Sequence, residues 1–284
     1  MIVADIILII ISIAALIFAS ITDIKTKEVP DWLSYALIAS GLFIRLLHSI
    51  IFSEYLYILY GILGFASMFI LGNILYHTKQ WGGGDAKLIM GLGSTLATTP
   101  FYLTTSSIPF LAILVVFIMF SGAIYGLVWS LSLIFKNIKK FKQEFKNINK
   151  TITAKTLKIL SLITTILLIV IIILLPRDYT FILIVLTVLT MLYPFLYLAI
   201  KSIENLYLYS YFTIDKLMEG DWIAEDIKRN NKILFHKKTS ITKRDIKKLK
   251  ELNIKKILIK DGIPFVPPFL MGTILALIIG NPLI

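Results

Sequence analysis

Cysteine is absent from this chain of 284 residues. Its absence excludes disulfide bonds, cysteine nucleophiles and zinc sites built from thiolates. Histidine is almost absent too: the three copies are His48, His77 and His236, and their scatter argues against a histidine-based metal site. Charged residues make up only 16% of the chain. Soluble globular domains rarely have such a composition, so an ordinary water-soluble enzyme is not predicted.

Hydrophobic residues, in contrast, account for 57% of the chain, and its mean hydropathy is +0.85. These values predict a polytopic membrane protein, in which burial in lipid and between helices replaces a single water-excluding core. The formal net charge is +12, nearly all from lysine. In a membrane protein such an excess usually marks cytoplasmic loops rather than a nucleic-acid site, so no nucleic-acid partner is expected.

The long hydrophobic runs predict eight transmembrane helices, because about 20 apolar residues suffice to cross a bilayer. They cover residues 2–21, 32–51, 55–76, 86–97, 109–135, 157–175, 179–200 and 263–284. We interpret the first run as a retained span rather than a signal peptide, because no basic region precedes it and no small-residue cleavage site follows it. The fourth run contains Gly91 and Gly93, small residues that permit close helix packing.

The expected fold is therefore an all-α polytopic membrane protein with a small α/β module before its last helix. The transmembrane domain covers residues 1–200, the soluble cytoplasmic module 201–262 and the final helix 263–284. Within the first domain, the lysine-rich residues 136–158 form either a basic amphipathic helix on anionic lipid or a solvated loop.

Short strands are predicted in the module, together with a helix that Thr242 and Asp245 begin as a capping box. The strands cover residues 221–227, 232–236 and 254–259, and the helix covers 243–252. Ile246 and Leu249 should lie on the inner face of that helix.

The distribution of lysine predicts the membrane orientation. Basic segments follow the first, third, fifth and seventh spans. The opposite loops at 48–55, 98–108 and 176–178 contain only one lysine or arginine, which is Arg177. Because cytoplasmic loops carry the excess of lysine and arginine, the N-terminus is expected outside. Asp23 and Asp85 then both lie on the cytoplasmic side of the plasma membrane.

The most informative stretch is Trp81-Gly82-Gly83-Gly84-Asp85-Ala86-Lys87, a glycine-rich turn after which a new apolar helix begins. The three glycines are expected to give the turn backbone angles that other residues avoid, and to leave room for another backbone. Asp23, at the end of the first span, has a comparable position. Ionisable groups at a membrane boundary are costly and point to function.

Two carboxylates that meet can share a catalytic water. In an aspartic protease one carboxylate takes a proton from water, while the other donates a proton to the scissile carbonyl oxygen. We therefore predict that Asp23 and Asp85 are the catalytic pair. The nearby Asp31 and Lys87 are candidates for tuning this pair.

At this point the chain resembles the type IV prepilin peptidases, most closely the archaeal ones that include the preflagellin (prearchaellin) peptidases of the GxGD aspartyl protease group. The GxGD motif corresponds to Gly82–Asp85. The family's first aspartate, followed by basic residues and an Ile-Pro-Asn-like segment, corresponds to Asp23-Ile-Lys-Thr-Lys-Glu-Val-Pro-Asp31. Asp31 stands where asparagine is common and adds a third nearby acid. Ile263-Pro264-Phe265 before the last span also matches, whereas the middle spans and the module carry little that can be matched.

The resemblance implies a membrane endopeptidase that removes a short basic leader from pilin-like or flagellin-like precursors on the cytoplasmic side. Its partners would be these precursors and membrane lipid, and it would need neither a metal nor an organic cofactor. Bacterial relatives often add N-methylation and carry a cysteine-rich zinc insert. Because cysteine is absent, we expect peptidase activity without methylation.

Two other membrane classes also hold such carboxylates. An ion-coupled transporter, the main alternative, would place them near the middle of the bilayer and often within repeated halves. Here both acids lie at the ends of spans, and no repeat is visible. The presenilin and signal peptide peptidase group shares GxGD but carries its first aspartate late, in a Tyr-Asp pair, which this chain lacks.

Structural roles are expected for the other polar and aromatic residues near the ends of spans. Trp81 is interpreted as an interfacial aromatic. Arg45 and His48 are expected to snorkel or to pair with Glu54. The prolines before the last span are expected to break the helix that enters it; they are Pro264, Pro267 and Pro268.

Overall fold

A computed structural model describes residues 2–103, 108–174, 179–217, 220–229, 232–237, 241–252, 254–260 and 262–281. The chain forms two compact units. Unit 1 comprises Met1–Gly126 with Gly262–Ile284, and unit 2 comprises Leu127–Asp261. The predicted transmembrane domain over residues 1–200 thus extends over both units. Arg177, from which part of the membrane orientation was predicted, lies outside the described residues.

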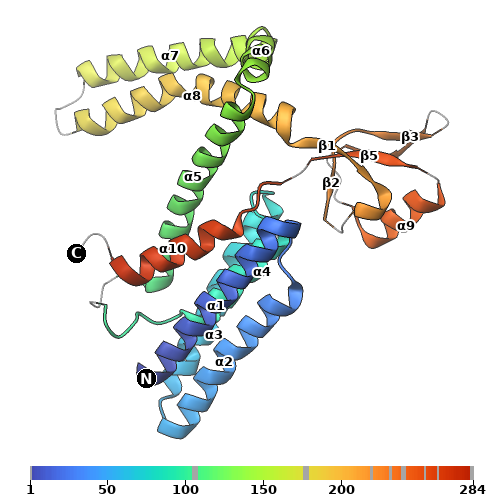
Figure 1. Cartoon of the computed structure of the whole chain (residues 1–284). Helices are drawn as coiled ribbons and strands as arrows, with labels where there is room; N and C mark the ends of the chain where they lie inside the picture. Colours follow the sequence, from blue (N-terminus) through green and yellow to red (C-terminus); the bar gives the residue numbers. More distant parts are fainter. Residues whose placement is uncertain are drawn as a thin grey trace. The chain divides into compact units, whose positions relative to one another are not determined.

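Unit 1 consists of helices, and the first four in the sequence lie side by side (Figure 1). The helices of unit 1 are α1 (Ile2–Thr26), α2 (Asp31–Phe52), α3 (Tyr55–His77), α4 (Gly83–Thr95), the first part of α5 (Phe110–Lys136) and α10 (Val266–Ile279). Contacts join α4 to α1, α2 and α3, and α10 to α1. The segments on either side of the middle unit therefore build one helical bundle.

Six helices in the described part of the chain are long and apolar enough to cross a membrane. They are α1, α2, α3 and α5 together with α7 (Ile152–Leu174) and α8 (Thr180–Tyr207). The predicted all-α polytopic architecture is confirmed, but the count of eight spans is not. The fourth and last predicted spans form α4 and α10, of 13 and 14 residues. At a rise of about 1.5 Å per residue these helices are about 20 Å long, shorter than a hydrocarbon core of about 30 Å.

Short as it is, α4 forms the centre of unit 1. Leu88, Ile89 and Leu92 in this helix are fully buried. Neighbouring helices approach it closely because small residues line the contact. A Cβ atom built on Gly93 would lie 2.5 Å from the carbonyl oxygen of Gly64 in α3. The predicted packing role of glycines in this segment is therefore confirmed.

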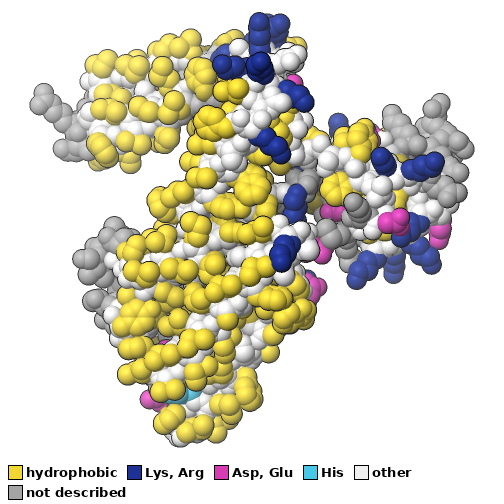
Figure 2. All heavy atoms as spheres, in the orientation of Figure 1, with side chains coloured by type: hydrophobic (Ala, Val, Ile, Leu, Met, Phe, Trp, Pro, Cys, Tyr) yellow, Lys and Arg dark blue, Asp and Glu magenta, His cyan; other side chains and the backbone are white. Residues whose placement is uncertain are grey.

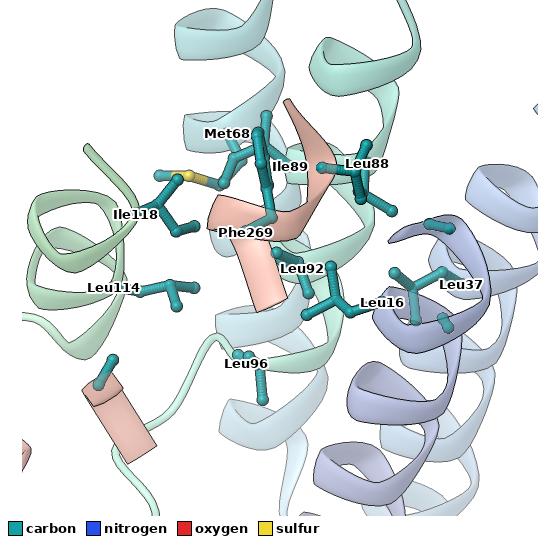
Figure 3. Packing of buried hydrophobic residues seen from close by; sticks show 14 of the residues in the cluster. Leu16, Leu37, Met68, Leu88, Ile89, Leu92, Leu96, Leu114, Ile118 and Phe269 are labelled. Atoms are coloured by element: carbon teal, nitrogen blue, oxygen red, sulfur yellow. The ribbon is translucent and has the colours of Figure 1, made fainter. Parts of the chain in front are cut away.

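The apolar centre of unit 1 is built around α4 and α10 (Figure 3). Phe269 of α10 is fully buried and lies among leucine and isoleucine side chains from other helices. Those labelled in Figure 3 include Leu16, Leu37, Leu88, Ile89, Leu92, Leu114 and Ile118. In lipid, such helices associate through van der Waals packing, because hydrocarbon surrounds them on the outside as well.

A buried polar network closes the C-terminal end of α4. The Arg45 side chain is fully buried; its Nε donates to the Ser94 carbonyl at 2.9 Å and its Nη2 to the Thr95 carbonyl at 2.9 Å. The Tyr57 hydroxyl donates to Asp5 Oδ1 at 2.6 Å. A cation at the last carbonyls of a helix satisfies orphan acceptors and favours the helix dipole. The prediction that Arg45 snorkels towards the membrane surface is wrong.

The nearby His48 behaves as expected. Its Nδ1 lies 3.6 Å from Glu54 Oε2, and its ring lies between those of Phe52 and Tyr57, with centroids at 4.6 and 4.8 Å. The predicted pairing of His48 with Glu54 is confirmed.

Unit 2 begins with the last part of α5 and contains a helical hairpin and a small sheet module. The elements are α6 (Ile138–Asn149), α7, α8, β1 (Tyr209–Thr213), the 3-10 helix η2 (Ile214–Lys216), β2 (Trp222–Ile223), β3 (Ile227–Arg229), β4 (Lys232–Phe235), α9 (Lys243–Glu251) and β5 (Lys256–Lys260). Helices α7 and α8 lie side by side (Figure 1). The Ser161 hydroxyl of α7 donates to the Thr190 carbonyl of α8 at 2.6 Å.

The lysine-rich stretch after α5 forms the helix α6, so the alternative of a solvated loop is wrong. Asn137 Oδ1 caps α6 by accepting from the Lys140 amide at 3.2 Å. On its apolar face, Phe145 and Ile148 pack with residues of α7 and α8 rather than facing outwards. Figure 2 shows lysine side chains gathered over this helix.

The module contains the antiparallel sheet β1-β5-β2 and the hairpin β3-β4. The predicted capping box is confirmed: Thr242 Oγ1 accepts from the Asp245 amide, and Asp245 Oδ2 accepts from the Thr242 amide at 2.9 Å. These hydrogen bonds hold the pKa of Asp245 below its ordinary value. Leu249 is fully buried and Ile246 packs on the core, as predicted. The predicted strand over 221–227 is interrupted between β2 and β3, and β1 was not predicted.

Candidate active site

Asp23 lies in the last turn of α1 and is buried, with 6% of its surface exposed. Its Oδ2 accepts a hydrogen bond from the Val266 amide at 2.8 Å, and the Phe265 amide interacts with it as well. Val266 begins α10, where the first amides have no acceptor within the helix. Pro267 and Pro268 come next and carry no N–H group. Asp23 therefore satisfies the N-terminal end of α10.

Asp85 is the third residue of α4 and is partly buried. Its Oδ2 accepts from the Gly82 amide at 3.1 Å, the acidic half of a capping box. The carboxylate is thus held against the start of its own helix, where the dipole favours a negative charge.

The glycines of the motif act through size rather than unusual backbone angles. Among described glycines, only Gly220 and Gly280 have positive φ, so the prediction that Gly82–Gly84 need such angles is wrong. A Cβ atom on Gly84 would lie 3.1 Å from Val29 Cβ in the segment between α1 and α2. Gly84 therefore allows that segment to approach the start of α4.

Valine at position 84 should lower the free energy of unfolding by about 1–3 kcal/mol, because overpacking forces neighbours to move. Gly83→Val is the matched control, since its Cβ would lie 3.7 Å from the Tyr76 ring, an ordinary contact. Thermal unfolding of the full chain in detergent, followed by circular dichroism, measures both. Equal losses in the two variants would contradict the close contact between Gly84 and Val29.

The fold brings Asp23 and Asp85 together although 62 positions separate them in the sequence. Helices α1 and α4 are in contact, and the two carboxylates are close enough to interact electrostatically. Each uses its Oδ2 to accept a backbone amide, which holds the carboxylate in position at the start of a helix. Such an arrangement can perform general acid and base chemistry.

The two candidate tuning residues pair with each other. Lys87 Nζ lies 2.6 Å from Asp31 Oδ1, and it also lies 5.7 Å from the Tyr35 ring centroid. The side chain of Asp31 is 62% exposed, and it provides the acidic first turn of α2. Asp31 is thus compensated by a cation, in contrast to the buried Asp23.

Trp81 and Tyr125 are two aromatic residues whose surroundings in the structure differ from what the sequence indicated or were not indicated by it. Trp81 is 7% exposed and packs on Phe265 and Phe269, with ring centroids at 6.5 and 5.0 Å; the prediction of an interfacial aromatic is wrong. Tyr125 of α5 is close enough to Asp23 for an electrostatic interaction. No sequence signal pointed to Tyr125. The resemblance of Ile263-Pro264-Phe265 to the family could have drawn attention to Phe265, which contacts Trp81.

Close contacts between α5 and α10 fix the position of Tyr125. A Cβ atom on Gly272 of α10 would lie 2.5 Å from Ile118 Cα, and one on Gly122 would lie 2.7 Å from the Phe265 ring. The two helices therefore touch along their glycines. Since Tyr125 is one turn beyond Gly122, it lies at the same end of the bundle as Asp23.

Part of this chain, including both aspartates, is similar to known proteins. Residues 10–134 match the model of the type IV leader peptidase family. The chain is 38% identical over 81 residues to a preflagellin peptidase of Methanocaldococcus jannaschii, covering 28% of this chain and 34% of the relative. It is 30% identical over 137 residues to a preflagellin peptidase of Methanococcus voltae, covering 45% and 57%.

A further relative is the prepilin peptidase EppA of Methanothermobacter thermautotrophicus, 32% identical over 90 residues, covering 32% of this chain and 23% of the relative. The chain thus spans between about a quarter and just over half of the length of these relatives. The family match contains Asp23, the glycine motif and Asp85. The resemblance found in the motifs is therefore confirmed, because residues 10–134 match the model of the type IV leader peptidase family.

Proposed function

We propose that this protein is a membrane-embedded aspartic endopeptidase that removes the short basic leader from type IV pilin-like precursors, either prepilins or preflagellins. The observation that carries the proposal is that Asp23 at the end of α1 and Asp85 at the start of α4 lie on helices in contact, inside the segment that matches the leader peptidase family. The relatives named preflagellin or prepilin peptidase support the substrate class.

The proposed reaction needs only the two carboxylates and a water molecule. One carboxylate removes a proton from the water, whose oxygen attacks the scissile carbonyl carbon, and the other carboxyl group donates its proton to the carbonyl oxygen. When the tetrahedral intermediate collapses, the C–N bond breaks and the leaving amine takes up a proton. The amides of Gly82 and Val266 hold the two side chains in place. No methyl transfer forms part of the proposal.

We propose that cleavage takes place at the cytoplasmic face of the plasma membrane. Asp23 lies at the end of α1 and Asp85 at the start of α4, and the lysines after α1 and α3 indicate a cytoplasmic position. A substrate peptide must be extended to expose its carbonyl group, whereas lipid favours helices whose backbone groups are all paired internally. A site at the boundary resolves this conflict, because water can hydrate the extended leader.

The test uses the purified full chain and a pilin-like precursor with a basic leader. We expect a shortened product whose new N-terminus lies just before the hydrophobic segment, without the added mass of a methyl group. Mass spectrometry of the product measures both. A precursor already lacking its leader should stay unchanged. An intact precursor together with carboxylate-dependent ion flux in proteoliposomes would instead support the transporter and end the proposal.

A further inference from the structure

Unit 2 contains a cavity that the proposed peptidase site does not use. Its volume is about 310 Å³, and it lies where α5 passes into α6 beside the end of α8. Its lining residues are Lys136, Asn137, Lys140, Leu206 and Tyr207. All of them lie beyond residue 134, where the family match ends.

The lining is suited to an anion. Two of its five residues are lysines and none is acidic. The hydroxyl of Tyr207 is buried and has no hydrogen-bond partner among the residues that the structure describes, which is costly unless a ligand or water satisfies it. Asn137 caps α6, so the positive N-terminal end of that helix adjoins the cavity as well.

The acids nearest in sequence are already engaged. Glu144 of α6 accepts from Asn205 at 2.8 Å. Glu204 of α8 lies 2.9 Å from Lys201 and 2.7 Å from Lys260, and it also accepts from the Tyr209 hydroxyl at 2.8 Å. Among the ion pairs of the described residues, none involves Lys136 or Lys140, so the charge of these two lysines is available to a ligand.

The location of the cavity identifies the source of the anion. Lys136 is the last residue of α5, and Leu206 and Tyr207 end α8; both helices are long enough to cross the membrane. The cavity therefore lies where lipid headgroups meet water. Basic pockets between transmembrane helices on the cytoplasmic side bind phosphate-containing headgroups. We propose that this cavity binds the phosphate of an anionic lipid, with Lys136 and Lys140 as its charge partners and Tyr207 as a hydrogen-bond donor.

Native mass spectrometry of the full chain in a neutral detergent tests the proposal. Dimyristoyl phosphatidylglycerol should bind at least about tenfold more tightly than dimyristoyl phosphatidylcholine, a difference that two charge-assisted contacts can supply. In the double variant Lys136→Gln/Lys140→Gln this preference should fall to within about twofold. Tyr207→Phe, which removes only the hydroxyl group, should weaken phosphatidylglycerol binding about threefold to tenfold.

The double variant Lys139→Gln/Lys142→Gln is the matched control, because it removes the same charge from α6 at residues that do not line the cavity. It should keep the preference of the wild type. An equal loss in both double variants would overturn the site, because general surface charge would then explain the binding. Competition by inorganic phosphate at the same concentration as the lipid would also overturn it, because the cavity would then be a free-phosphate site. Unchanged unfolding temperatures without lipid show that every variant is folded.

Discussion

Asparagine in place of either Asp23 or Asp85 is expected to abolish cleavage of a pilin-like precursor, with a loss of at least about 10²- to 10⁴-fold in rate. An amide can neither take a proton from water nor donate one as an acid. Asparagine nevertheless keeps the size of the side chain and an oxygen that accepts from Val266 or Gly82. The helix ends should therefore stay in place. Initial rates of product formation by the purified full chain measure the effect.

The matched control is Asp31→Asn, which removes a carboxylate from the same end of the bundle. Asp31 is mostly exposed and pairs with Lys87, and such exposed pairs contribute only about 0–1 kcal/mol. We expect its rate to stay within about threefold of the wild type, which corresponds to that energy. Residual cleavage close to wild type in Asp23→Asn or Asp85→Asn would remove that carboxylate from the mechanism. A complete loss in Asp31→Asn would move the catalytic role to this third acid.

The second large effect concerns stability and comes from Arg45. Methionine at this position should lower the free energy of unfolding by about 3–5 kcal/mol, because the variant removes a buried cation that interacts electrostatically with the buried Asp5. It also removes the donors to the Ser94 and Thr95 carbonyls at the end of α4. Unfolding of the full chain in mixed micelles with increasing denaturing detergent, followed by circular dichroism, provides the measurement.

A double-mutant cycle with Asp5→Asn separates the two contributions. If Arg45 and Asp5 compensate each other across the network, the double variant should lose clearly less stability than the sum of the single variants. Additive losses would show that Arg45 acts only as the cap of α4. In neither single variant should the cleavage rate of the folded fraction change strongly, because the network closes the end of α4 opposite to Asp85.

Much of the helical architecture could be predicted from hydrophobic runs alone. The predicted spans over 32–51, 55–76 and 109–135 agree with α2, α3 and α5 to within about two residues. Long apolar stretches leave few alternatives, because lipid requires every backbone group to be paired within its own segment. The capping pair Thr242 and Asp245 could also be predicted, because its two hydrogen bonds join residues only three positions apart in the sequence.

The sequence could not predict what depends on contacts between distant segments. The hydrogen bond from Val266 to Asp23 joins residues 243 positions apart. The burial of Trp81 depends on two phenylalanines of α10, and that of Arg45 on the carbonyls of α4. Side-chain type alone favoured the membrane surface for both residues. Tertiary packing decided otherwise.

The shortness of α4 has a consequence for how the protein is made. A helix of 13 residues that contains glycines, a serine and a threonine is too short and too weakly hydrophobic to insert into a membrane by itself. We therefore expect α4 to enter the bilayer packed against α2 and α3, which are long and apolar enough to cross a membrane. During biosynthesis the proposed dyad is therefore completed late, because Val266, whose amide holds Asp23, follows it by 243 positions in the chain.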